Sequence, residues 1–236
     1  MNILTSIHSS AFRHSPPSAV PNFWFVAGET TERKTGSSIT TVGLSLVDSY
    51  SGKKAYVNNT NATIGYLEFP GVISHTTRIW SVAMAFGAID TSMASKSVQC
   101  PLFMQGAEYD VSSNFVNHAI SYLGSTTSIV IDEFSPSGGS ATFTANLKTL
   151  LENGGVLVIV HDNVNAKMYV NGALYDTKAH SEIYSSTTPT HCLFLARNTA
   201  WQDRSVTGVE LCAGAVYDTT LTLAQVQSLT FASLTA

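Results

Sequence analysis

Short apolar segments in which side chains alternate between two faces recur along most of this chain, and they constrain its fold more than any other feature. In the longest segment, Ile79–Ile89, every second residue from Trp80 to Phe86 is large and apolar. Similar segments follow at intervals of about 8–12 residues, separated by Ser, Gly, Pro and Asn turns. Because successive side chains of a strand point to opposite faces, the pattern predicts an all-β fold of many antiparallel strands, arranged as a two-sheet sandwich or jelly roll.

Thirteen segments carry the strand pattern. They are Asn22–Val26, Ile39–Val47, Ala62–Phe69, Ile79–Ile89, Leu102–Met104, Ala119–Leu123, Ser128–Phe134, Ala141–Ala145, Val156–His161, Ala166–Val170, Ala173–Asp176, Cys192–Ala196 and Val209–Tyr217. Asn171-Gly172 is the strongest hairpin signal, and Leu147–Asn153 predicts one helical turn. Thr222 followed by Gln225 forms a capping box, which predicts a short C-terminal helix.

The chain divides into an arm and one domain. Residues 1–21 contain Pro16, Pro17 and Pro21 and no acidic residue, so we expect an extended N-terminal arm that contacts other copies or other proteins. Residues 22–236 form a single β-sandwich, because such domains reach about 200–250 residues. Three cysteines cannot form a disulfide framework, and we expect Cys192 and Cys212 to be buried free thiols.

Composition excludes several classes of protein. Only 12% of the residues are charged, whereas 29 Ser and 27 Thr make up nearly a quarter of the chain; a soluble domain usually has about 25% charged residues. High hydrophobicity with low charge excludes disorder. A net charge of −4 without basic runs argues against nucleic acid and against a membrane surface as partners.

Four segments, in order, resemble laminin-G-like, concanavalin A-like lectin/glucanase domains. The second reads Lys-Met-Tyr-Val-Asn-Gly-Ala-Leu, like the second strand and turn of the central hairpin of that family. The segments are Val156–Asp162, Lys167–Leu174, Leu193–Arg197 and Gly208–Val226. The resemblance extends over about Asn22 to Leu229 and implies a jelly roll of two curved antiparallel sheets, with six or seven strands each.

The resemblance also implies where calcium and catalytic groups would lie. A calcium ion at the sandwich rim would use Asp48, but Cys212 or Ala213 stands where the family usually has its second carboxylate, so we expect no metal site and Asp48 in a turn. Related glucanases use two carboxylates on one strand face. Asp132 and Glu133 are adjacent and fall on opposite faces, so we expect no glycoside hydrolase or lyase activity.

One segment combines the side chains that contact sugars. Arg197, Asn198, Trp201, Gln202 and Asp203 lie in an expected loop, with one indole among charged and amide groups. Such a cluster suits a glycan or a receptor protein. The alternative is structural: Trp201 folds under the loop and Arg197 pairs with Asp203.

Three functions remain open at this point. The first is a non-catalytic virion protein, such as a bacteriophage decoration, tail or receptor-binding subunit, with a host surface glycan as a candidate ligand. The second is a carbohydrate-binding lectin module of a secreted protein, and the third is a glycan-active enzyme. We favour the first, because the chain has the arm, shows no secretion signal and has a hydroxyl-rich surface composition suited to a particle assembled in the host cytoplasm.

Overall fold

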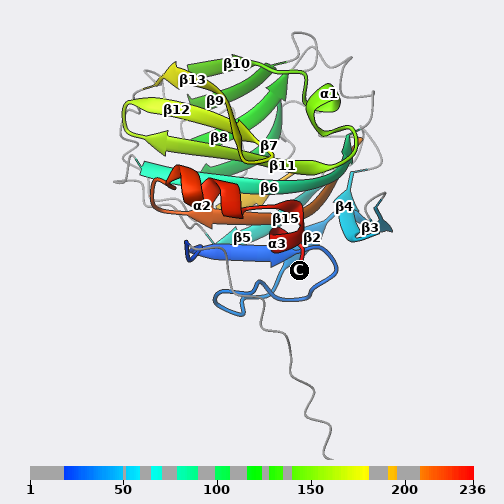
Figure 1. Cartoon of the computed structure of the whole chain (residues 1–236). Coiled ribbons are helices and arrows are strands. Elements are labelled where there is room, and N and C mark those ends of the chain that lie inside the picture. The colour runs from blue at the N-terminus through cyan, green and yellow to red at the C-terminus, as the bar shows by residue number, and fades with distance from the viewer. Residues whose placement is uncertain are drawn as a thin grey trace, which may run out of the picture.

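Two antiparallel sheets face each other in the computed structural model, as Figure 1 shows. The structure describes residues 19–49, 52–58, 65–70, 79–89, 99–106, 116–123, 128–134, 140–180, 191–195 and 208–236. The predicted jelly-roll sandwich is confirmed, with eight described strands in one sheet and seven in the other.

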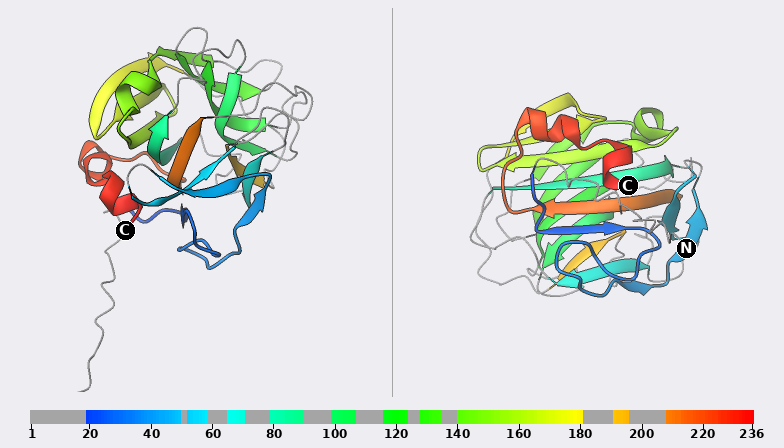
Figure 2. Two further views of the ribbon diagram at one scale, coloured as in Figure 1. Left: turned by 90° about the vertical axis from the view of Figure 1, so that its right-hand side faces the viewer. Right: turned by 60° about the horizontal axis from the view of Figure 1, so that its bottom comes forward.

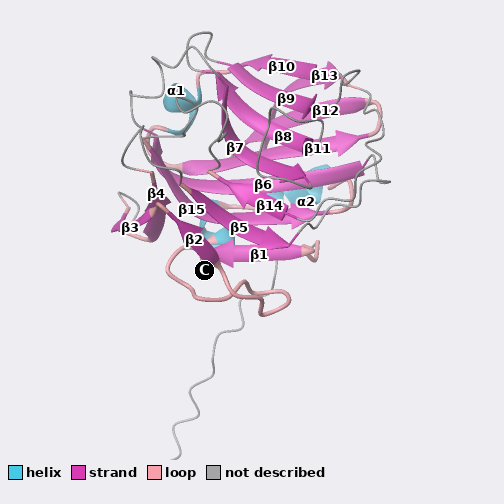
Figure 3. Ribbon diagram, turned by 180° about the vertical axis from the view of Figure 1, so that it is seen from behind, coloured by secondary structure: helices cyan, strands magenta, loops and turns pink. Residues whose placement is uncertain are grey.

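The eight-stranded sheet lies in front in Figure 1, and the seven-stranded sheet faces the viewer in Figure 3. The first has the order β13 (Ala173–Ala179), β12 (Asn165–Val170), β11 (Gly155–Asp162), β6 (Ile79–Ile89), β15 (Val209–Tyr217), β4 (Lys54–Val57) and β3 (Ser45–Asp48), with β1 (Phe23–Val26) also paired to β15. The second has the order β10 (Ser140–Thr144), β9 (Ser128–Phe134), β8 (Val116–Leu123), β7 (Gln99–Gly106), β14 (His191–Phe194), β5 (Tyr66–Pro70) and β2 (Thr40–Val42).

Local sequence sets the β11–β12–β13 meander. Asn171 and Gly172 have φ of 50° and 80°, as a two-residue turn of the primed type requires, and the Asn171 side chain accepts a hydrogen bond from Val156 N at 2.8 Å. Asn163, in the preceding turn, also has a positive φ, 76°. The predicted hairpins are therefore confirmed.

Aromatic rings fill the space between the sheets. Phe25 of β1 lies 5.0 Å from Phe194 of β14 and 5.4 Å from Phe69 of β5, measured between ring centroids. Gly214 of β15 makes room for them: a Cβ there would lie 2.5 Å from Phe25 and 2.8 Å from Phe194. A side chain at position 214 would therefore push the sheets apart at this point.

A second apolar layer covers the outer face of the eight-stranded sheet. Two short helices, α2 (Leu223–Ser228) and α3 (Phe231–Leu234), lie across this sheet in Figure 1. Val226 and Leu234 are fully buried in one cluster with Trp24, on the outer side of β1. The capping box is formed, since Gln225 N donates to the Thr222 hydroxyl at 3.3 Å and Thr222 N to the Gln225 side chain at 2.8 Å.

Strand β1 and the C-terminal helices lie close to each other, as both views in Figure 2 show. The Trp24 indole N–H donates to the Leu234 carbonyl at 3.0 Å, and Lys53 Nζ donates to the Thr235 carbonyl at 3.1 Å. Ala19, the first described residue, is buried in the same cluster as Leu234. The N-terminal segment therefore enters on the outer side of the eight-stranded sheet.

Some boundaries differ from the predicted ones. The predicted strand Ile39–Val47 is two strands in different sheets, β2 and β3, because the chain turns at Gly43 with φ of 60°. Strand β4 and helix α3 were not predicted, whereas helix α1 (Leu147–Leu151) was. Cys192 and Cys212 are free and buried, as expected.

Removal of a ring from the aromatic cluster between the sheets should destabilise the fold. We expect Phe194→Ala to lower the free energy of unfolding by about 3–5 kcal/mol, because it leaves a cavity between the sheets. Leu174→Ala is the control: this side chain is 53% exposed, so its change should stay within about 0.5 kcal/mol. Urea unfolding measures both, and equal effects would contradict the packing.

Candidate functional site

The loop predicted to contact a ligand lies outside the described residues. This holds for Arg197, Asn198, Trp201, Gln202 and Asp203. The assignment of these side chains to a contact site therefore stays a prediction. The described residues on either side of segment 196–207 show where this segment leaves the fold and where it rejoins it.

Segment 196–207 connects the two sheets. Leu195, with φ of 53°, follows β14, and Gly208, with φ of 73°, precedes β15. Phe194 is paired with Leu67 of β5, so the antiparallel register places Leu195 opposite Tyr66. Neighbouring strands are about 4.8 Å apart; the segment therefore leaves the sheet one strand away from Tyr66.

The outer face of β5 carries an aromatic ring and a carboxylate. Tyr66 and Glu68 alternate with two buried core residues of β5 and are half-buried themselves. Strand β2 places Val42 opposite Tyr66 and Thr40 opposite Glu68. We call these four side chains the β5 ledge, and Figure 3 shows the two strands at the lower end of the sheet.

Electrostatics couple the two titratable members of the β5 ledge, Tyr66 and Glu68. The pKa of the Tyr66 phenol is raised, first by burial and then by the negative charge of Glu68. The hydroxyl therefore stays protonated at neutral pH and is able to donate a hydrogen bond. When it is ionised, the carboxylate of its neighbour Glu68 accepts hydrogen bonds and donates none.

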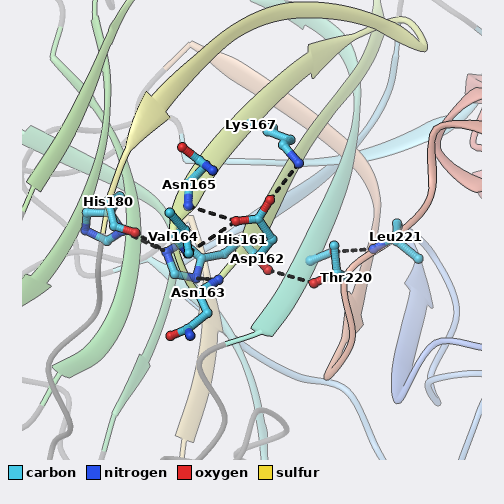
Figure 4. Close-up of polar contacts among 10 residues, drawn as sticks. His161, Asp162, Asn163, Val164, Asn165, Lys167, His180, Thr220 and Leu221 are labelled. Carbon is cyan, nitrogen blue, oxygen red and sulfur yellow. Dashed lines mark hydrogen bonds and ion pairs between the residues drawn. The ribbon is translucent and has the colours of Figure 1, made fainter.

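A second polar cluster lies at the turn between β11 and β12 (Figure 4). Asp162 accepts hydrogen bonds from Val164 N at 3.2 Å and Asn165 N at 2.8 Å, and Lys167 Nζ lies 2.6 Å from its other oxygen. Burial alone would raise the pKa of Asp162, but these bonds and the lysine charge outweigh it and lower the pKa. These three contacts all lie within the turn, so Asp162 stabilises the hairpin.

Two histidines lie beside this turn and are closed off from solvent. His180 Nδ1 is 3.0 Å from His161 Nε2, and Asn163 N donates to His161 Nδ1 at 3.4 Å. Trp80 stacks on His161 with 5.6 Å between ring centroids, and the two histidines are 0% and 4% exposed. The sequence did not indicate the pairing of His161 with His180, because the two residues belong to different elements, and in this arrangement neither ring reaches a substrate in solvent.

Asp48 does not fit the rim calcium site that the family resemblance implies. Its side chain is 84% exposed and lies 2.6 Å from Lys54 Nζ, so an ammonium group stands where a cation would bind. Cys212, at the position of the usual second carboxylate, is a buried thiol. No group of three His, Cys, Asp or Glu side chains that could hold a metal occurs in the described ranges.

Comparison with solved structures shows the fold in other proteins. Domain 4 of AbnA, a GH43 extracellular arabinanase from Geobacillus stearothermophilus solved with arabinotriose, aligns with a TM-score of 0.61 and 16% identity over 89% of this chain and 97% of that one. The binding domain of botulinum neurotoxin DC, in complex with rat synaptotagmin II, gives 0.65 and 11% over 91% and 52%. Trypanosoma rangeli sialidase, in complex with sialic acid, gives 0.58 and 10% over 88% and 32%.

These matches establish the β-sandwich fold. The chain spans about half of the toxin binding domain and a third of the sialidase. No family model and no curated protein matches the sequence. In the part of the chain that the structure describes, no helix is long and apolar enough to span a membrane.

The role of Asp162 predicts an acid-dependent stability difference. Its folded pKa is lowered, so its contribution is present above the unfolded pKa of about 3.9 and is lost as pH falls through the folded value. We expect Asp162→Asn to cost about 1 kcal/mol at pH 7, and this cost to shrink as the pH falls below the unfolded pKa and through the folded one. Urea unfolding across this pH range, with Asp48→Asn as the exposed control, checks this; a cost that does not shrink in acid would contradict it.

Proposed function

We propose that this chain is a non-catalytic, lectin-like adhesion protein that binds glycan through segment 197–203 and through the β5 ledge, next to which this segment leaves the described fold. The observation that carries the proposal is the register of β14 and β5, in which the segment departs next to Tyr66. Trp201 and Tyr66 would supply aromatic surface for the apolar face of a sugar. Asn198, Gln202 and Glu68 would supply hydrogen-bonding groups of the kind that fix ligand orientation.

The similar structures support a glycan as the ligand. The arabinanase domain was solved with arabinotriose and the sialidase with sialic acid. A further match, botulinum neurotoxin type C, depends for cell entry on interaction with two ganglioside molecules. These ligands belong to those proteins; for this chain they support the class of ligand and not its identity.

The spacing of carboxylates supports a binding role over a hydrolytic one. Glycosidases place two carboxyl groups about 5–10 Å apart. Glu68 and Asp132 lie in one row of paired residues across the seven-stranded sheet, but Asp132 is on the fourth strand from β5, about 19 Å away at about 4.8 Å per strand. Asp132 and Glu133 are consecutive in β9.

Within this function we place the protein in a virion, with other virion proteins or further copies of itself as partners through the N-terminal arm. Low charge, the Ser- and Thr-rich composition and the arm support this proposal. Ala19 packs on the outer side of the eight-stranded sheet, opposite the β5 ledge, so a chain held by its arm would present the ledge outward. A secreted lectin module is the alternative, and it would bind glycan without assembling.

Loss of either aromatic ring should weaken glycan binding. We expect Trp201→Ala and Tyr66→Ala each to weaken glycan binding on an array by about fivefold or more, since stacking on a ring is worth about 1 kcal/mol or more. Tyr175→Ala is the matched control, because Tyr175 is 43% exposed on β13 of the other sheet. Unchanged melting temperatures show that the variants fold; a wild-type protein that binds no glycan would end the proposal.

Removal of the arm should separate folding from assembly. We expect a chain lacking residues 1–18 to keep its melting temperature, because the deletion spares buried Ala19 and the hydrogen bond from Asn22 N to Val216 O. The same deletion should abolish co-purification with the particle or oligomer. A truncated chain that still assembles would contradict the role of the arm.

A further inference from the structure

We infer that the β5 ledge takes the end of a glycan, about two sugar residues long, and that no internal stretch of a longer glycan lies across the seven-stranded sheet. This inference rests on the proposed function and names the ligand class of the same site. It is carried by the exposure of side chains along the outer face of this sheet, which is open at its edges and closed in its middle.

One row of paired residues crosses this face. It runs from Thr40 of β2 through Glu68 of β5, Leu193 of β14 and Met104 of β7 to Ala119 of β8. Leu193, Met104 and Ala119 are outside the core cluster between the sheets, but each has a member of that cluster next to it in its strand. Because neighbouring residues of a strand point to opposite faces, these three side chains lie on the outer face.

Solvent exposure along this row ends between β5 and β14. Thr40 is exposed and Glu68 is half-buried. Next to them, Leu193 and Met104 are 2% and 1% exposed, and Ala119 is fully buried. The chain itself therefore keeps solvent away from the middle of this face, so a glycan has no open surface to contact at these positions of β14, β7 and β8.

A second row of pairs shows the same closure from the opposite edge of the sheet. Thr142 of β10 is paired with Val130 of β9, and Val130 with Ser121 of β8. All three face outward, because the residues on either side of each belong to the core cluster. Thr142 is exposed, whereas Val130 and Ser121 are buried. The outer face is therefore open along its two edges, which Figure 3 shows at its upper and lower ends, and closed between them.

The open area at the β5 ledge is small in both directions. Across the strands, β2 and β5 offer about 10 Å before the closed part begins at Leu193, since strands lie about 4.8 Å apart. Along the strands, β2 has only three residues, or about 10 Å, because the chain turns at Gly43 and joins the other sheet. A sugar residue is about as long as one strand spacing, so the ledge holds about two residues.

The first test is a series of oligosaccharides of increasing length. The probes are linear oligosaccharides of arabinose, glucose and galactose, together with the shortened forms of the best glycan on the array, and calorimetry measures their affinities. We expect the disaccharide to bind more tightly than the monosaccharide, and longer members to gain less than about threefold, because their further residues stay in solvent. A larger gain with length would show an extended ligand and overturn the inference.

The second test uses two matched substitutions at opposite edges of the same face. Thr40 and Thr142 are both exposed threonines on the outer face, on the edge strands β2 and β10. We expect Thr40→Leu to weaken glycan binding by about fivefold or more, because it removes a hydroxyl and fills part of the open area. Thr142→Leu is the control and should leave the affinity unchanged. Melting temperatures show whether both variants fold.

The outcomes separate this inference from the proposed function. If both substitutions weaken binding, the ligand extends across the sheet, and the inference is wrong while glycan binding stands. If neither does, the β5 ledge is not the contact surface, and the inference is again overturned. If the wild-type chain binds no glycan at all, the proposed function fails, and the inference fails with it.

Discussion

The contact of Phe25 with Phe69 and Phe194, made possible by the missing side chain at Gly214, is the interaction on which the other features depend. It joins the first strand of the described chain to β15 on one side and to the seven-stranded sheet on the other. Because β1 is fixed beside β15, the C-terminal segment begins close to the N-terminal one. The helices α2 and α3 then cover the outer face of the same sheet, and Trp24 bonds to Leu234.

The same contact positions the candidate site. Phe194 is the last residue of β14 and faces inward, so the next residues of the chain depart at the end of the core, beside β5. Tyr66 and Glu68 face outward because Leu67 and Phe69 face inward. The β5 ledge thus lies on the outer face of a strand whose inner face belongs to the core.

Local patterns in the sequence were sufficient for most of the fold. Two-residue alternation revealed the long strands, Asn171-Gly172 revealed a hairpin and Thr222 with Gln225 revealed α2, since each signal acts within a few residues. The break at Gly43 was missed because nothing local shows that the two halves join different sheets. Likewise, the alternation around Leu67 could have shown that Tyr66 and Glu68 share a face, but only the pairing of β14 with β5 shows that the chain leaves β14 next to Tyr66.

Charged residues are few, and they are distributed differently on the two sheets. On the eight-stranded sheet, lysines form ion pairs with nearby carboxylates, whereas the strands of the seven-stranded sheet contain carboxylates and two histidines but no lysine or arginine. The outer face of the first sheet is occupied by the chain's own C-terminal segment. We therefore place ligand recognition on the outer face of the seven-stranded sheet, near β2 and β5.

A backbone NMR titration of the wild-type chain with the best array ligand tests this placement most directly. We expect the largest chemical-shift changes in β5, β2 and segment 196–207, with the β12–β13 hairpin and α2 unaffected. Changes centred on the eight-stranded sheet, or on the His161–His180 end of the sandwich, would contradict it.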